Sequence, residues 1–190
     1  EILIKYRRTS IRAFFTANAK LLMLGSFPPQ KKRWSMEFFY PNLQNDMWRI
    51  FGIIFFQNKD TFWILTKKYL TRNVLLIFWT KKGIALYDTA SAVRRLQDNA
   101  SDKFLEVVEQ TDISLLLKQI PNVQGHCNHR TKSNGYYSWT NKGKRTRCRN
   151  QWTFEFEDRT MRLYRMPSSS RAYRCPLKKN QQYTGSCSMS

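Results

Sequence analysis

The histidines and cysteine in QGHCNHRTKSNGYYSW, residues 124–139, are the side chains that most suggest chemistry. His126, Cys127 and His129 are all residue types that bind Zn²⁺. Their spacing matches no standard zinc-ligand pattern, and Cys148 and Cys175 have no neighbouring cysteine to complete a site. We therefore expect neither a bound metal nor a cofactor.

Two other loops combine small, aromatic and polar side chains: residues 24–48, LGSFPPQKKRWSMEFFYPNLQNDMW, and residues 166–173, MPSSSRAY. Taken singly, each feature has an ordinary structural explanation. A Gly-Ser-Phe-Pro segment forms a turn, an asparagine before a helix is usually a cap, and three serines form a solvated loop. Asp88 and Asp102 are best explained as caps, and we assign them no role. Any chemistry depends on the elements that bring the two loops together.

The first loop lies between a predicted strand and a predicted helix. Residues 19–29, AKLLMLGSFPP, are a short apolar run that ends in small and rigid residues, which predicts a buried strand entering a loop. Residues 44–56, QNDMWRIFGIIFF, have apolar side chains at helical spacing from Met47 onward. We expect a helix with one buried face there.

The rest of the chain continues the alternation of predicted strands and predicted helices. Residues 82–90 predict another short strand, and residues 99–120 predict one or two helices that end at Pro121. Residues 153–173 alternate as a strand pair that leads from Met166 into the serine loop. Alternating strands and helices indicate a single α/β domain over residues 1–190. Its site should lie at the carboxyl ends of the strands.

The order and spacing of the two loops resemble the uracil-DNA glycosylase superfamily, most closely its mismatch-specific and hypoxanthine-DNA glycosylase branch. The resemblance covers residues 20–57, 83–121 and 154–173. It implies a three-layer αβα sandwich on a central parallel four-stranded sheet. It also implies a monomeric, cytoplasmic, bacterial-type enzyme that flips uracil, hypoxanthine or mismatched thymine from double-stranded DNA and hydrolyses its N-glycosidic bond.

The resemblance also implies roles for individual residues. Asn45 occupies the position of an asparagine that holds water below C1′, and Tyr40 that of a ring stacked on the flipped base. Three residues would form the wall of the base pocket: Gly25, Ser26 and Phe27. Four would contact DNA phosphates or the opposite strand: Ser168, Ser169, Ser170 and Arg171. Leu43 departs from the family, where proline is expected, which leaves the backbone path to Asn45 undefined.

The charge of the chain is unevenly distributed. The 33 Lys and Arg and 13 Asp and Glu give a net charge of +20. Four stretches account for +18 of this charge: residues 1–19, 59–82, 122–153 and 174–190. The charge itself is therefore poor evidence for DNA binding. The opening EILIKYRRTS lacks the apolar region of a signal peptide, and no apolar run reaches the ~18 residues of a membrane span.

These four stretches are also consistent with shifted reading frames. The family has a strand ending in Thr-Thr-Gly where HCNHRTKSNGYY, residues 126–137, stands, and permitted codons for these residues give IVTTGQKATDT when shifted by one base. Residues 63–82 can similarly give LDTDKKIFNKERIIDFLDKK, an amphipathic helix. TSIRAF, residues 9–14, can give HPFEPF, and residues 181–189 can give AIYRKLFN. We hypothesise that the four stretches are wholly or partly out-of-frame translations.

Two alternatives to an active glycosylase remain. The chain is a non-catalytic basic protein that binds nucleic acid through its Arg, Lys and aromatic residues, or it is an inactive frameshifted product. If the chain exists as written, we expect one sheet strand, a pocket loop and a terminal helix to be lost. Because net stability is only ~5–15 kcal/mol, such losses predict poor folding and little activity.

Overall fold

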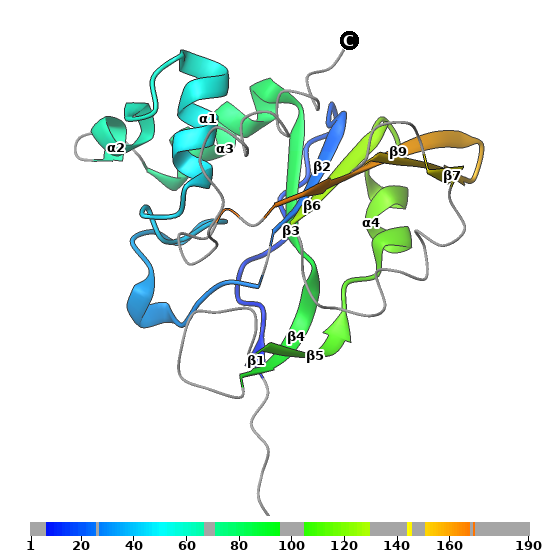
Figure 1. Cartoon of the computed structure of the whole chain (residues 1–190), viewed down its shortest axis with the longest axis horizontal. Coiled ribbons are helices and arrows are strands. Elements are labelled where there is room, and N and C mark those ends of the chain that lie inside the picture. The colour runs from blue at the N-terminus through cyan, green and yellow to red at the C-terminus, as the bar shows by residue number, and fades with distance from the viewer. Residues whose placement is uncertain are drawn as a thin grey trace, which may run out of the picture.

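The computed structural model of the chain describes residues 7–25, 27–66, 71–95, 105–129, 144–145, 151–167 and 169. Within these residues, helices and strands form a mixed α/β fold around a central sheet (Figure 1). The predicted α/β class is therefore confirmed. None of the helices that the structure describes is long and apolar enough to cross a membrane.

The central sheet has six described strands, in the order β3-β2-β6-β9-β8-β7. β3, β2, β6 and β9 pair in parallel, and β8 and β7 continue the sheet in antiparallel pairing. The sheet is thus larger and more mixed than the expected four-stranded parallel one. Its strands are β2 (Leu21–Gly25), β3 (Ile84–Asp88), β6 (Gly125–His129), β7 (Lys144–Arg145), β8 (Gln151–Phe156) and β9 (Arg159–Met166).

β2 has a strand on each side, and its side chains are buried alternately on the two faces of the sheet. Met23 points to a core shared with the helices α1 (Met47–Phe56), α2 (Thr61–Thr66) and α3 (Arg72–Lys82). Leu22 and Leu24 point to a second core shared with α4 (Ile113–Gln119). Because residues alternate across a strand, a continuous apolar run becomes a strand buried on both faces.

Helix α1 lies where residues 44–56 predict it. Met47, Ile50 and Phe51 are buried in the first core, and the chain leaves the helix at Gln57, whose φ of 56° is left-handed. The Phe51 ring packs edge-on against Trp79 of α3, with 4.6 Å between ring centroids. Aromatic contacts of this kind attach the three helices to each other.

A smaller sheet corrects the prediction for residues 99–120. β5 (Leu105–Gln110) is a strand, not part of a helix, and pairs antiparallel with β4 (Ala90–Arg95). The β1 strand (Arg7–Arg8) pairs with the other edge of β4. LEVVEQ has the alternation of a half-buried strand, and its pairing with β4 decides its structure. The helix begins later, at Ile113, where the side chain of Asp112 accepts a hydrogen bond from the backbone N–H of Leu115 at 3.1 Å.

The chain as written supplies the strand that we expected it to lack. β6 lies between β2 and β9 and pairs in parallel with both, with Cys127 opposite Met23 and Tyr164. Cys127 is buried in the first core. The expectation of a lost sheet strand is therefore wrong, because GHCNH places a small apolar side chain at the position that needs one. The pocket loop and terminal helix lie outside the described residues.

Candidate active site

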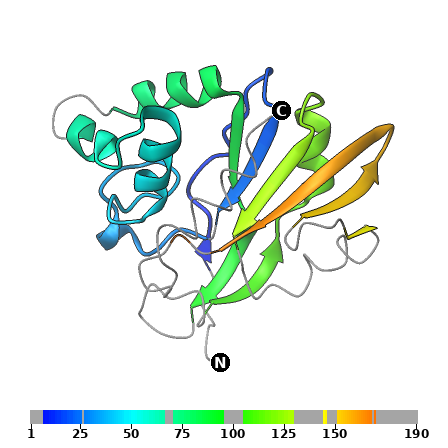
Figure 2. The same cartoon turned by 45° about the horizontal axis from the view of Figure 1, so that its top comes forward.

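Two neighbouring strands of the central sheet end side by side at the predicted edge. Gly25 is the last residue of β2 and Asp88 the last of β3, and the two are paired in register. The backbone N–H of Thr89 donates to the Gly25 carbonyl at 2.9 Å, which extends this pairing by one step. Figure 2 shows the loop that follows β2 running from this edge toward α1. The carboxyl edge is thus the position where residues of the first loop meet the sheet.

Tyr40 is held beside Gly25. Its backbone has a left-handed φ of 51°, and its carbonyl accepts a 2.8 Å hydrogen bond from Nε1 of Trp48 in α1. Its hydroxyl lies 3.4 Å from where a Cβ would stand on Gly25, and its ring meets Phe51 edge-on at 6.3 Å between centroids. A glycine therefore allows the phenol ring to approach the end of β2 closely.

Asn45 lies at the start of α1. Its Oδ1 accepts a hydrogen bond from the backbone N–H of Met47 at 2.9 Å, which forms an Asx turn around Asp46, the N-cap residue of the helix. The amide nitrogen Nδ2 takes no part in that bond and remains a separate hydrogen-bond donor. The Asx-turn hydrogen bond and the water-holding role are therefore compatible, because they use different atoms of the same amide.

A backbone hydrogen bond joins the two loops that are far apart in the sequence. The N–H of Asp46 donates to the carbonyl of Ser169 at 3.1 Å, and Ser169 is buried at 5% exposure. The predicted serine loop therefore reaches the residue next to Asn45. Ser26, Ser168, Ser170 and Arg171 lie outside the described residues.

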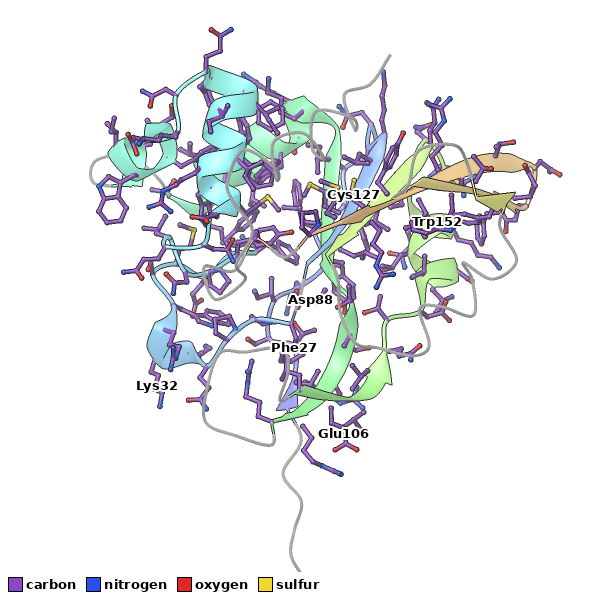
Figure 3. All side chains as sticks on the ribbon, in the orientation of Figure 1. Phe27, Lys32, Asp88, Glu106, Cys127 and Trp152 are labelled. Carbon is purple, nitrogen blue, oxygen red and sulfur yellow. The ribbon has the colours of Figure 1, made fainter. Side chains whose placement is uncertain are left out.

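Phe27 lies toward the smaller sheet. Its side chain is 8% exposed and packs with Ala90 and Val93 of β4. Nη2 of Arg95 donates to the carbonyl of Pro28 at 2.6 Å, which holds the loop against the same sheet. Figure 3 shows Phe27 and Asp88 near one another where the two sheets meet.

Asp88 is the residue at this edge that sequence reasoning missed. Its side chain is 2% exposed, and its Oδ2 accepts a 2.5 Å hydrogen bond from Oγ1 of Thr9. Burial raises the pKa of Asp88 to about 7, and the hydrogen bond from Thr9 opposes part of that rise. Burial also raises the pKa of Tyr40, with smaller contributions from Asp88 and Cys127. The only cue in the sequence is an aspartate directly after an apolar strand.

The HCNH segment, whose histidines and cysteine suggested metal ligands, lies within a strand of the central sheet. Its backbone forms β6, and Cys127 is 4% exposed within the apolar core. No group of three or more His, Cys, Asp or Glu side chains is placed to hold a metal ion among the described residues.

No family model and no curated protein sequence matches the chain. Ten chains of solved structures match its fold. One is the solution NMR structure of a candidate uracil DNA glycosylase from Methanosarcina acetivorans, with a TM-score of 0.64 and 21% sequence identity. The match covers 95% of this chain and 96% of that one. The chain therefore shares its fold with this solved structure over almost the whole length of both.

Proposed function

We propose that the chain is built as a monofunctional DNA glycosylase of base-excision repair, acting on uracil, hypoxanthine or mismatched thymine in double-stranded DNA. The observation that carries the proposal is the hydrogen bond from the Asp46 N–H to the Ser169 carbonyl. This bond joins the first loop to the serine loop, at residues more than 120 positions apart in the sequence and close to Asn45 and Tyr40. A site built from both loops requires such a contact. The fold shared with a candidate uracil DNA glycosylase supports the same assignment. The proposal includes a single monomeric domain over residues 1–190, the mismatch-specific and hypoxanthine-specific branch, and a cytoplasmic location.

In the proposed reaction, the flipped base lies against the loop that contains Gly25 and Tyr40. Stacking on an aromatic ring is worth ~1–3 kcal/mol per base in single-strand binding, and Tyr40 would supply such a ring. Nδ2 of Asn45 would donate to the water that adds to C1′, while Oδ1 stays bound to the helix. The bond from C1′ to the base breaks and its electron pair leaves with the base. Water supplies the hydroxyl at C1′, and the proton that this water loses ends on the departing base anion. Ser168, Ser169, Ser170 and Arg171 would hold the DNA.

The test separates the catalytic role of Asn45 from its hydrogen bond to the first turn of α1. Asn45→Ala removes both, whereas Asn45→Ser retains an oxygen that can accept from the Met47 N–H. We expect both variants to lose base release by at least tenfold, and only Asn45→Ala to lose about 1 kcal/mol of stability, because it alone loses the hydrogen bond to Met47. DNA binding should persist in both. Base release by Asn45→Ser at the parental rate would refute the catalytic role, and binding without base release by the parent protein would favour a non-catalytic binder.

We also propose that residues 63–82 are encoded in another frame. Ile64 and Ile77 are each 56% exposed and Val74 is 43% exposed. The shifted reading LDTDKKIFNKERIIDFLDKK places charged residues at all three positions. It keeps apolar residues at the buried Leu75 and Trp79, and it replaces an indole whose buried Nε1 has no hydrogen-bond partner among the described residues.

The agreement between exposure in the structure and polarity in the shifted frame supports the frameshift hypothesis. Apolar side chains that face water are an aggregation risk, which charged side chains at the same positions would remove. Accurate sequencing of the gene tests this directly. A single uninterrupted frame through codons 59–82 would refute it.

A further inference from the structure

Tyr40 has an unusual backbone conformation for its place in the chain. It is one of three residues other than glycine with a left-handed φ among the described residues, at 51°. The other two occupy ordinary positions for this conformation, because Gln57 ends helix α1 and Glu157 lies in the turn between β8 and β9. Tyr40 ends neither a helix nor a strand. Since the left-handed region is costly for a bulky side chain, contacts from elsewhere must hold Tyr40 there.

The indole of Trp48 supplies such a contact from helix α1. Its Nε1 donates a 2.8 Å hydrogen bond to the Tyr40 carbonyl. Trp48 is 2% exposed, and its ring packs against Phe51 of the same helix and Phe62 of α2, with 6.2 and 5.2 Å between ring centroids. A hydrogen bond is strongest when donor and acceptor are aligned, so a donor fixed in this way holds the Tyr40 carbonyl in one direction.

The direction of the Tyr40 carbonyl sets the direction of the Tyr40 ring. The carbonyl and the side chain are attached to the same Cα, so the hydrogen bond and the left-handed φ together decide where Cβ points. In this conformation the ring reaches the end of β2, with its hydroxyl 3.4 Å from where a Cβ would stand on Gly25. Loss of the hydrogen bond would let the backbone relax to a negative φ, which turns the ring away from Gly25.

Trp48 also contacts the other proposed reactive residue. Its backbone N–H donates to the Asn45 carbonyl at 3.3 Å. One residue is therefore bonded to the asparagine that would hold water and to the tyrosine that would stack on the base. We propose that Trp48 is a positioning residue, whose indole N–H holds the Tyr40 ring in place for the flipped base and in a fixed relation to Asn45. This inference rests on the proposed glycosylase function and adds to it a residue that acts through Tyr40.

Trp48→Phe tests the hydrogen bond, with Trp79→Phe as a matched control. Both substitutions replace a buried indole of the same core by a smaller ring. Only Trp48→Phe removes a hydrogen bond, because Nε1 of Trp79 has no partner among the described residues. In single-turnover base release at a temperature where both variants are folded, Trp48→Phe should be slower than the parent by about fivefold, and Trp79→Phe by less than about twofold. Equal losses in the two variants would overturn the proposal.

A double variant shows whether Trp48 acts through the ring of Tyr40. Tyr40→Ala removes that ring, so the hydrogen bond to its carbonyl has no stacking side chain left to direct. Adding Trp48→Phe to Tyr40→Ala should therefore slow base release by less than about twofold, although it slows release by the parent about fivefold. A loss of about fivefold in both backgrounds would show that Trp48 acts by another route, and the proposal would fail.

A variant of the same shape guards against loss of packing at position 48. 3-Benzothienylalanine has sulfur in place of the indole N–H, so it fills nearly the same volume and cannot donate the hydrogen bond. This variant should release bases as slowly as Trp48→Phe. Release at the parental rate would contradict the proposal, whatever the stability of Trp48→Phe.

An NMR measurement distinguishes this proposal from the function on which it rests. Nuclear Overhauser contacts between the Tyr40 ring protons and the Gly25 α-protons should be present in the parent and in Trp79→Phe, and should be lost in Trp48→Phe. If the contacts behave in this way but the parent releases no base, the glycosylase function fails and the positioning of Tyr40 stands. If the parent releases bases and the contacts persist in Trp48→Phe, the positioning fails and the function stands. If the contacts persist and no base is released, both fail.

Discussion

At the residue scale, the carboxyl edge combines residues that the sequence identified with one that it did not. Asn45, Tyr40 and the serine loop were found because their order resembles a family. Asp88 was assigned as a cap because an aspartate after a strand usually is one. Its buried carboxyl accepts a hydrogen bond from Thr9, which lies 79 residues earlier in the chain. Local pattern cannot report such a contact.

Burial of Asp88 predicts that stability falls as the pH rises. Below about pH 4 the carboxyl is protonated in the folded and the unfolded chain, because its ordinary pKa is 3.8. Between roughly pH 4 and 7 the folded chain keeps a proton that the unfolded chain has lost. In this range the free energy of unfolding therefore falls by up to about 1.4 kcal/mol for each unit of pH increase. Above that range both states are ionised and the effect is constant.

Asp88→Asn should remove this slope. Urea unfolding at several pH values from 4 to 8 measures it, with the exposed Asp158→Asn as a matched control that should retain the parental slope. Asp88→Asn should therefore gain stability relative to the parent as the pH increases. Parallel slopes for the parent and Asp88→Asn would show that the Asp88 pKa is close to its ordinary value.

At the element scale, periodicity predicted α1 well and β5 badly. α1 has its own buried face, so its sequence contains the information that defines it. LEVVEQ is too short for its period to be decisive, and pairing with β4 makes it a strand. The loss of the strand at β6 was predicted wrongly for a related reason. The buried Cys127 lies between Met23 and Tyr164 of the adjacent strands, and this single apolar side chain is enough for the segment to pair inside the sheet.

Helix α3 gives a direct test of which of its positions face water. Ile77→Asp should change stability by no more than about 0.5 kcal/mol and reduce aggregation, because Ile77 is 56% exposed. Leu75→Asp places a charge at a site that is 1% exposed and should unfold the domain. Thermal melts and light scattering measure the two effects. Equal destabilisation by both substitutions would mean that α3 packs through a different face.

At the scale of the whole molecule, the fold and the net charge come from different stretches of the sequence. The α/β fold was predictable because it depends on the apolar strands and on α1, which lie mostly in the stretches of ordinary composition. The net charge of +20 comes mostly from other stretches. The sheet is retained while Ile64 and Ile77 are exposed, which is the pattern that the frameshift proposal expects.

The most direct test of the glycosylase assignment is a single-turnover assay of base release from duplexes that carry uracil or hypoxanthine. It should include the chain as written, a version with the four shifted stretches restored, and Asn45→Ser in the restored version. We expect base release by the restored protein, slower release by the chain as written, and a loss of at least tenfold in Asn45→Ser. A folded restored protein that releases neither base, or that releases one equally well with Asn45→Ser, would contradict the account.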